Sequence, residues 1–162
     1  MLVLAVVAAS VAAQGSAREE AVGLNNRGVA LMSQQATQKA AESFEASRKA
    51  DPKLARAAIN DGIALMTLQK LDEAKAALQQ AIATDPKSAA AWYNLGLAQH
   101  AGNEMEDALK SFLEATKFDP QDADSYYFAG ACYQELKQYD EAIAVLKKAL
   151  EIDPMHASGE FG

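Results

Sequence analysis

The dipeptide Asp-Pro occurs four times in the chain, and each copy lies 34 residues after the one before it. The four prolines of the sequence all belong to this series: Pro52, Pro86, Pro120 and Pro154. Proline disfavours helical geometry in the residue before it and has no amide hydrogen to donate, so the same helix end is marked in each unit. The chain is therefore expected to use one structural unit four times.

Three more sequence columns share this 34-residue period. They hold a glycine (Gly28, Gly62, Gly96, Gly130), an alanine (Ala40, Ala74, Ala108, Ala142) and a large apolar residue (Phe44, Leu78, Phe112, Leu146). Apolar residues follow helical spacing in both halves of a unit, which predicts two amphipathic helices. We expect the helices to cross where glycine and alanine lack bulk, with the Phe112 ring filling the space beside them.

This pattern resembles the tetratricopeptide repeat family. The 34-residue unit of that family reads roughly W-x-x-L-G-x-x-Y, then A-x-x-x-F-x-x-A, then P. The third unit fits best, through Trp92, Leu95, Gly96, Ala108, Phe112, Ala115 and Pro120. The resemblance covers residues 21–154, in units 21–54, 55–88, 89–122 and 123–154. It implies an all-α fold, a right-handed α-solenoid of four helical hairpins and eight helices, in which stacking gives one continuous core.

Some residues depart from the family pattern, and others fit it as helix caps. Arg27 and Asp61 stand where the family favours leucine. Their opposite charges could pair between neighbouring units, but exposure of both to solvent is the simpler expectation. Ser88 and Asp122, two residues after a proline, are expected to cap the helices that follow.

Charge and cysteine content exclude several classes of function. The net charge is -7 with a pI near 4.8, so the chain offers no overall positive surface for nucleic acid or for an anionic membrane. Cys132 is the single cysteine, which excludes an internal disulfide and a cysteine-based metal cluster. We interpret it as a small buried apolar residue rather than a reactive thiol.

The two ends of the chain lie outside the repeat array. Residues 1–13 are apolar and uncharged, too short to span a bilayer, and resemble a secretory signal peptide without its basic start. The alternatives are an apolar helix packed on the first repeat, or a start codon placed inside a longer gene. Residues 14–20 are expected to be a linker, and residues 155–162 an uncapped tail or the start of a further unit. The protein is thus expected to be exported, periplasmic or extracellular, if residues 1–13 are a signal peptide, and cytoplasmic otherwise, without stable membrane insertion of the mature chain.

No sequence motif for catalysis or for a cofactor is present. The chain has no glycine-rich phosphate loop, G-x-S-x-G, H-E-x-x-H or Cys-x-x-Cys, and its two histidines, His100 and His156, are interpreted as solvated. We expect no catalytic residues, no metal site and no cofactor, and hence no enzyme.

The family resemblance implies a binding groove lined by the first helix of each unit. The residues expected there are Asn26, Val29, Ile59, Asn60, Ile63, Tyr93, Asn94, Leu97, Tyr127 and Phe128. The asparagine column either holds a peptide backbone or serves packing, since its amide both donates and accepts. The apolar columns favour a ligand with apolar side chains.

A second binding mode of the family, the clamp for acidic chaperone tails, lacks its cations here. The clamp uses Lys or Arg and Asn at set columns of the groove. Here those columns carry Asn25, Val29, Ala90 and Asn94, and Asn60 alone matches the residue that the clamp requires. The sequence therefore predicts a non-catalytic scaffold that binds an extended or helical peptide segment of a partner protein in its groove. The alternatives are self-association through the C-terminal hairpin or the groove, and a binding arm of a larger, truncated enzyme.

Overall fold

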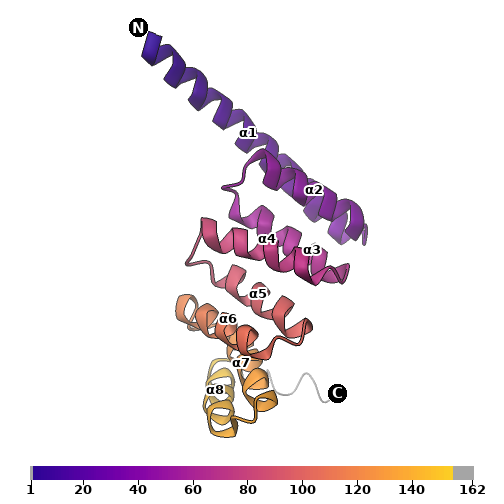
Figure 1. The fold of residues 1–162 in the computed structure, drawn as a ribbon, viewed down its shortest axis with the longest axis vertical. Helices are drawn as coiled ribbons and strands as arrows, with labels where there is room; N and C mark the ends of the chain where they lie inside the picture. Colours follow the sequence, from indigo (N-terminus) through magenta and orange to yellow (C-terminus); the bar gives the residue numbers. More distant parts are fainter. Residues whose placement is uncertain (1, 155–162) are drawn as a thin grey trace. The chain divides into compact units, whose positions relative to one another are not determined.

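The structure, a computed structural model, describes residues 2–154, with side chains from residue 14 onward. These residues form eight α-helices and no strand: α1 (Leu2–Ser33), α2 (Thr37–Ala50), α3 (Ala55–Thr67), α4 (Leu71–Thr84), α5 (Ala89–Ala101), α6 (Met105–Phe118), α7 (Ala123–Glu135) and α8 (Tyr139–Ile152). The helices pair as four antiparallel hairpins, α1 with α2, α3 with α4, α5 with α6 and α7 with α8 (Figure 1). The predicted all-α helical-repeat fold is confirmed.

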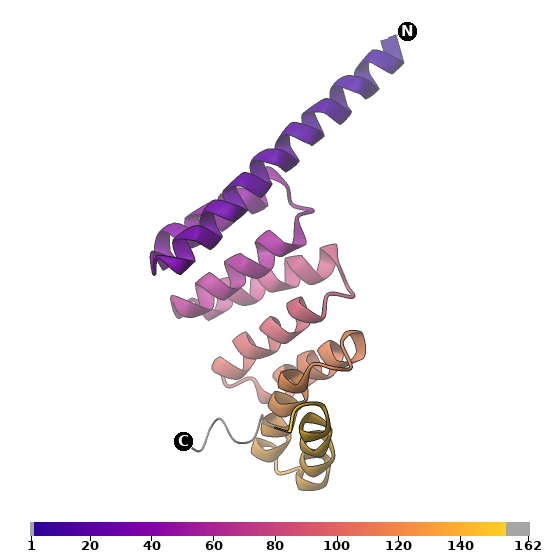
Figure 2. The same ribbon diagram turned by 180° about the vertical axis from the view of Figure 1, so that it is seen from behind.

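The helices divide into two compact units, Met1–Thr84 and Asp85–Gly162. In unit 1, α1 packs on α2, α3 packs on α4, and α2 and α3 join the two hairpins. In unit 2, α5 packs on α6, α7 packs on α8, and α6 and α7 make the join. Figure 2 shows the hairpins of each unit from behind. Each unit thus contains two hairpins and the interface between them.

Glycine makes the close crossing within each hairpin. A Cβ placed on Gly96 would lie 2.7 Å from the Phe112 ring, and one on Gly62 would lie 2.6 Å from Leu78. Gly28 faces Phe44 and Gly130 faces Leu146 in the same way. Because real Cβ contacts are much longer, only the missing side chain lets the second helix bring a large residue this close. The crossing predicted from the sequence columns is confirmed in all four hairpins.

A residue with positive φ ends the first helix of every hairpin. These residues again follow the 34-residue period: Gln35, Gln69, Asn103 and Lys137, with φ between 58° and 61°. At the turn after α3, the amide of Lys70 donates to the carbonyl of Leu65 and that of Gln69 to the carbonyl of Met66, each at 2.9 Å. This pair of bonds is the Schellman motif, which satisfies carbonyls at a helix end. The sequence columns did not reveal it, because glycine, the usual residue there, is absent.

The two predicted helix caps have different outcomes. The Ser88 hydroxyl accepts a hydrogen bond from the amide of Ala91 at 3.3 Å and caps α5 as predicted. Asp122 is the N-cap residue of α7, as predicted, but its side chain accepts no hydrogen bond from the amides of the first turn. Its carboxylate accepts a hydrogen bond from the Ser125 hydroxyl, which competes for the same oxygen atoms.

The first helix is longer than the repeat unit requires. Residues 14–20, expected to be a linker, are helical, because α1 runs without a break from Leu2 to Ser33 (Figure 1). Two contacts hold α1 to the turn and helix beside it: Arg18 pairs with Asp51 at 3.6 Å, and the Ser47 hydroxyl donates to the Ala21 carbonyl at 2.6 Å. The side chains of residues 1–13 and the whole of residues 155–162 lie outside the described part. In that part, no helix combines the length and apolar character needed to cross a membrane.

Cys132 belongs to the core of unit 2. It is fully buried beside Phe112, Leu109 and Ala129. Burial raises the pKa of its thiol to about 11, so the reactive thiolate is disfavoured. The structure agrees with its interpretation as a packed apolar residue.

Candidate functional site

Unit 1 has a small cavity between the first helices of its two hairpins. The cavity has a volume of about 200 Å³ and is lined by Val29 and Met32 of α1, Phe44 of α2, and Asn60 and Ile63 of α3. Three of these, Val29, Asn60 and Ile63, were predicted to be groove residues. Val29 is 50% exposed, so the cavity opens to solvent beside it. Apart from the Asn60 amide, the lining side chains are apolar.

The Asn60 amide is held by a residue of the preceding hairpin. Its Nδ2 donates to the Oδ1 of Asn25 at 2.9 Å. Asn25 lies on α1 and is only 3% exposed, so the bond satisfies an acceptor that would be costly to bury alone. The one polar group of the cavity therefore has a fixed orientation.

Unit 2 has an aromatic cluster on the corresponding helices. The ring of Phe128 on α7 stacks on Phe112 at 5.4 Å and meets Tyr93 of α5 edge-on at 6.0 Å. The Tyr127 ring lies 5.5 Å from Phe128, also edge-on. Burial, assisted by Asp124 and Asp122, raises the pKa of Tyr93 to about 12, so its hydroxyl stays protonated. Tyr93 and Phe128 are half-buried.

The three predicted asparagines lie in different surroundings. Asn60 faces the cavity of unit 1, while Asn26 is exposed on α1. Asn94 in unit 2 donates its amide to the Ala90 carbonyl of its own helix at 2.8 Å. The remaining predicted groove residues, Ile59 on α3 and Leu97 on α5, are half-buried, and Leu97 packs against the aromatic cluster. A single groove formed by all ten residues stays a prediction.

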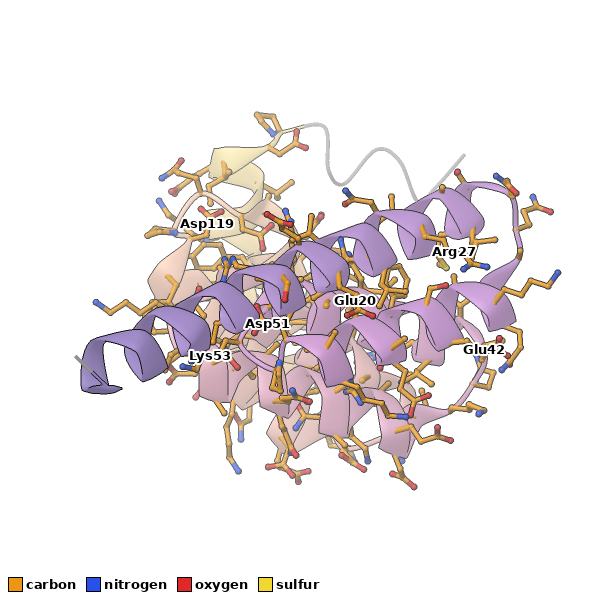
Figure 3. All side chains as sticks on the ribbon, turned by 90° about the horizontal axis from the view of Figure 1, so that it is seen from above. Glu20, Arg27, Glu42, Asp51, Lys53 and Asp119 are labelled. Atoms are coloured by element: carbon orange, nitrogen blue, oxygen red, sulfur yellow. The ribbon has the colours of Figure 1, made fainter. Side chains whose placement is uncertain are left out.

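A second cavity of unit 1, of about 260 Å³, lies beside an ion pair between its two hairpins, of which the carboxylate is buried. Arg48 of α2 and Asp61 of α3 both line it, and Arg48 Nε lies 3.1 Å from Asp61 Oδ2. Asp61 is 2% exposed, so the expectation that it reaches solvent is wrong, as is its suggested pairing with Arg27. Arg27 is exposed on α1, as expected (Figure 3). Burial raises the pKa of Asp61 to about 6 despite the nearby Arg48.

Comparison with known families identifies the repeat. The family model described as tetratricopeptide repeat matches residues 60–123. The chain is a tetratricopeptide-repeat protein. A second family model, described as regulator of microtubule dynamics protein 1-3, matches residues 98–160. A search of curated proteins found no match to the chain.

Several solved structures resemble about three quarters or more of the chain. One of MamA is 28% identical with a TM-score of 0.80, covering 86% of this chain and 81% of that one. One of YrrB, whose title describes a TPR protein with an unusual peptide-binding site, is 25% identical with a TM-score of 0.75, covering 85% and 71%. The first TPR of Spaghetti (RPAP3), bound to the HSP90 peptide SRMEEVD, is 21% identical with a TM-score of 0.72, covering 74% and 94%. That last likeness concerns the fold alone. The fold is thus that of protein-interaction scaffolds.

Sequence reasoning on this tetratricopeptide-repeat protein missed some residues that shape both cavities. Asn25 was considered only as a clamp position, yet it orients Asn60. Met32 lines the same cavity, but its column is apolar only in the first two units, as Met32 and Met66, and was not considered. Arg48 escaped notice because its partner Asp61 lies in another column of the next unit. A charged residue at an apolar column was the available signal, and a search for its partner across the interface would have found Arg48.

Proposed function

We propose that this chain is a non-catalytic scaffold that binds a peptide segment of a partner protein on the first helices of its hairpins. The observation that supports this most directly is the cavity lined by Val29, Asn60 and Ile63. Peptide sites need apolar pockets with a few fixed polar groups, and this cavity has that composition.

The cavity favours an aliphatic side chain next to an amide group. Its apolar walls, Val29, Met32 and Ile63, fit a side chain of the size of leucine or methionine. The Asn60 amide can hydrogen-bond a peptide group that lies beside that side chain. An extended segment meets both requirements, because successive side chains point to opposite sides and leave the backbone accessible.

Acidic chain ends are poor ligands for this surface. The RPAP3 structure contains an acidic peptide, but the charged clamp positions of this chain carry Asn25 and Ala90. A carboxylate would lack the cation that it needs. We therefore propose a ligand with apolar side chains and without a required terminal carboxylate. Its binding is independent of whether residues 1–13 are an export signal, which stays a prediction.

A random heptapeptide library displayed on phage tests this proposal. We expect the wild-type chain to select peptides with an aliphatic residue at one position, and Val29→Lys to weaken their binding at least tenfold by placing a charge in the cavity mouth. Ile143→Lys is a matched control, because Ile143 is equally exposed, at 52%, but lies on α8. Equal binding by both variants would place the ligand elsewhere.

Self-association is a second candidate function, supported by the surface of α8. Tyr139, Ile143 and Leu150 expose 61%, 52% and 42% of their surface along this helix. Leu109 occupies the repeat position of Ile143 one unit earlier and is buried in the core cluster of unit 2. The same repeat position is thus covered at Leu109 of α6 and open at Ile143 of α8, the last helix that the structure describes.

Sedimentation equilibrium at rising concentration separates the two candidates. Self-association through α8 predicts a concentration-dependent mass that Ile143→Lys abolishes and Val29→Lys leaves unchanged. A monomer at all concentrations would count against it. The third reading, a binding arm of a larger enzyme, predicts the same peptide site and is decided by the complete gene sequence.

A further inference from the structure

The second cavity of unit 1 has a charged lining. Its volume of about 260 Å³ is several times the roughly 30 Å³ that one water molecule occupies, so it has room for the head group of a side chain. The lining comes from α2, α3, the turn that follows and α4. Four carboxylates against two cations give it a net charge of −2; these residues are Glu42, Glu45, Asp61, Glu73, Arg48 and Lys70.

Asp61 is the lining residue whose hydrogen bonding is incomplete. Its side chain is only 3% exposed, and within residues 14–154 its carboxylate has an ion pair but no hydrogen bond. Arg48 Nε lies 3.1 Å from Oδ2, yet this nitrogen is a buried donor without a hydrogen bond, because its N–H is not directed at the oxygen. A carboxylate has about four acceptor sites, and burying it without hydrogen bonds is costly. A donor that enters the cavity from outside the chain would supply the missing bonds.

The repeat does not require a charge at this position. One and two repeats later the same column holds Leu95 and Ala129, both of them buried. Apolar residues in place of a buried ion pair are often neutral or stabilising, so Asp61 is not explained by folding alone. Burial raises the pKa of Asp61 to about 6, and a charge held in such surroundings beside a cavity is typical of a binding site.

The lining suits the guanidinium group of an arginine side chain. Carboxylates lie on three successive helices: Glu45 on α2, Asp61 on α3 and Glu73 on α4. A guanidinium has five N–H donors in one plane and is more weakly hydrated than an ammonium group, so it can bond to more than one carboxylate in a partly enclosed site. Leu65 and Leu68 line the same cavity and can pack on the aliphatic part of the arginine.

The lysines near the cavity leave it negatively charged. Lys49 pairs with Glu45 at 2.7 Å and Lys70 pairs with Glu73 at 3.5 Å, and all four side chains are at least 45% exposed. Exposed pairs of this kind contribute little to stability and rearrange readily. With Lys49 added to the lining residues, the net charge is still −1. A further cation is therefore attracted to the cavity.

We propose that this cavity binds an arginine side chain of a partner protein, with the guanidinium group bonded to Asp61 and to Glu45 or Glu73. The arginine uses the acceptor sites of Asp61 that Arg48 leaves unused. This inference goes beyond the proposed function, because α1 contributes no described residue to the lining and the cavity around Val29 is a different one.

NMR of the labelled full chain with N-acetyl-arginine methylamide as the probe tests the proposal. The probe should shift the carboxyl carbon of Asp61 and the Nε of Arg48. The matching citrulline compound has nearly the same shape without the charge, and it should bind at least about tenfold more weakly, the effect of a hydrogen bond between charged groups. Absence of both shifts, or equal binding of the two probes, overturns the proposal.

The pH dependence of binding gives a second readout. The charged groups that act on Asp61 are Arg48 and Glu45 of α2 and Glu73 of α4. A hydrogen bond from Lys49 and its charge lower the pKa of Glu45, so that group stays ionised between pH 5 and pH 7. Asp61 takes up a proton in this range, and the affinity for the arginine probe should therefore fall by up to about tenfold from pH 7 to pH 5. An affinity that is independent of pH overturns the role of Asp61.

Variants locate the site on the chain. Asp61→Asn should weaken the arginine probe at least about tenfold and remove the pH dependence, and Glu73→Gln should weaken it by less. Glu106→Gln is the matched control, because Glu106 is an exposed carboxylate on α6 of unit 2. Val29→Lys should leave the probe's binding unchanged, which separates this site from the proposed peptide surface.

Equal losses in Asp61→Asn and Glu106→Gln would show that the probe responds to net charge alone and would overturn the site. If Asp61→Asn does not fold, the comparison of Glu73→Gln with Glu106→Gln and the pH titration of the wild type decide the question. A loss confined to the cavity variants supports the proposal.

Discussion

Arg48 of α2 and Asp61 of α3 form an ion pair across the interface of the first two hairpins, with Nε and Oδ2 3.1 Å apart. In unit 2 the same repeat positions carry Thr116 and Ala129, which are buried without a charge. The Arg48 side chain keeps 23% of its surface exposed and that of Asp61 only 3%, so the cost of removing charge from water falls mainly on the carboxylate. The raised pKa of Asp61 is consistent with incomplete compensation by Arg48.

This pair makes stability depend on pH in a defined direction. The pKa of Asp61 is about 6 in the folded chain against an ordinary value of 3.8, mainly through burial, with Glu45 and Glu73 adding to the rise. The folded state therefore binds the proton more tightly than the unfolded chain. Protonated Asp61 therefore adds to the free energy of unfolding. This contribution, up to roughly 3 kcal/mol, is fully present below about pH 4 and is lost as the pH rises through 6.

Urea denaturation of the wild type and Asp61→Asn between pH 4 and pH 7 measures this contribution. The asparagine cannot titrate, so the difference in unfolding free energy between the two chains should change across this range. If the unfolding free energies of the two chains changed in parallel with pH, Asp61 would have an ordinary pKa and its surroundings would be more polar than described.

Replacing the whole pair should be better tolerated than removing one member. Arg48→Ile with Asp61→Leu introduces the residues found one repeat later, Ile82 and Leu95. We expect the double variant to be as stable as the wild type or up to about 4 kcal/mol more stable. Asp61→Leu alone should be the least stable, because it leaves Arg48 unpaired. Additive effects of the two single changes would show that the residues do not interact.

Gly96 should not tolerate a side chain. Even the Cβ of Gly96→Ala would meet the Phe112 ring at 2.7 Å, and Gly96→Leu should destabilise by about 1–3 kcal/mol or more through displacement of α6 from α5. Gly23→Ala is the control within a helix, because a Cβ there has no atom within 4 Å. It should stabilise α1 by about 0.5–1 kcal/mol. An unchanged denaturation midpoint for Gly96→Leu would contradict the helix crossing.

The turn residues with positive φ should accept glycine with a gain in stability. Gln69 has φ of 59°, a left-handed conformation that costs a residue with a Cβ roughly 1–2 kcal/mol. Gln69→Gly should raise the free energy of unfolding by up to about 1 kcal/mol, and Asn103→Gly by less, since asparagine tolerates this conformation better. Thermal unfolding of the two variants gives the comparison. An unchanged free energy of unfolding in Gln69→Gly would show that the turn imposes little strain on Gln69.

The repeat columns predicted what every unit shares, and they failed where one unit differs. The contact of Gly96 with Phe112 follows from small and large residues recurring at one spacing, so four copies supported one geometric conclusion. The Schellman turns recur as well, but their column holds Gln, Gln, Asn and Lys, and among these only Asn103 is a residue type that favours positive φ. Backbone geometry there is imposed by the hairpin and not by residue preference.

The candidate site was predictable only in part for a related reason. Val29, Asn60 and Ile63 were found because their columns lie on the first helices, and the structure places them around one cavity. The bond from Asn60 to Asn25 joins different columns of different units, so no single column reveals it. The same applies to Arg48 and Asp61. Contacts that are unique to one interface require coordinates, whereas contacts that recur can be deduced from the period.

NMR with the chain isotopically labelled, titrated with a peptide selected from the random library, tests the central claim most directly. Binding at the proposed surface predicts shifts of the methyl groups of Val29 and Ile63 and of the side-chain amide of Asn60, with no shift at Ile143 of α8. Asn60→Ala should then weaken the peptide about 2- to 10-fold and leave the backbone spectrum of α3 in place. Shifts confined to α8, or full affinity in Asn60→Ala, would contradict the account and move recognition away from the unit 1 cavity.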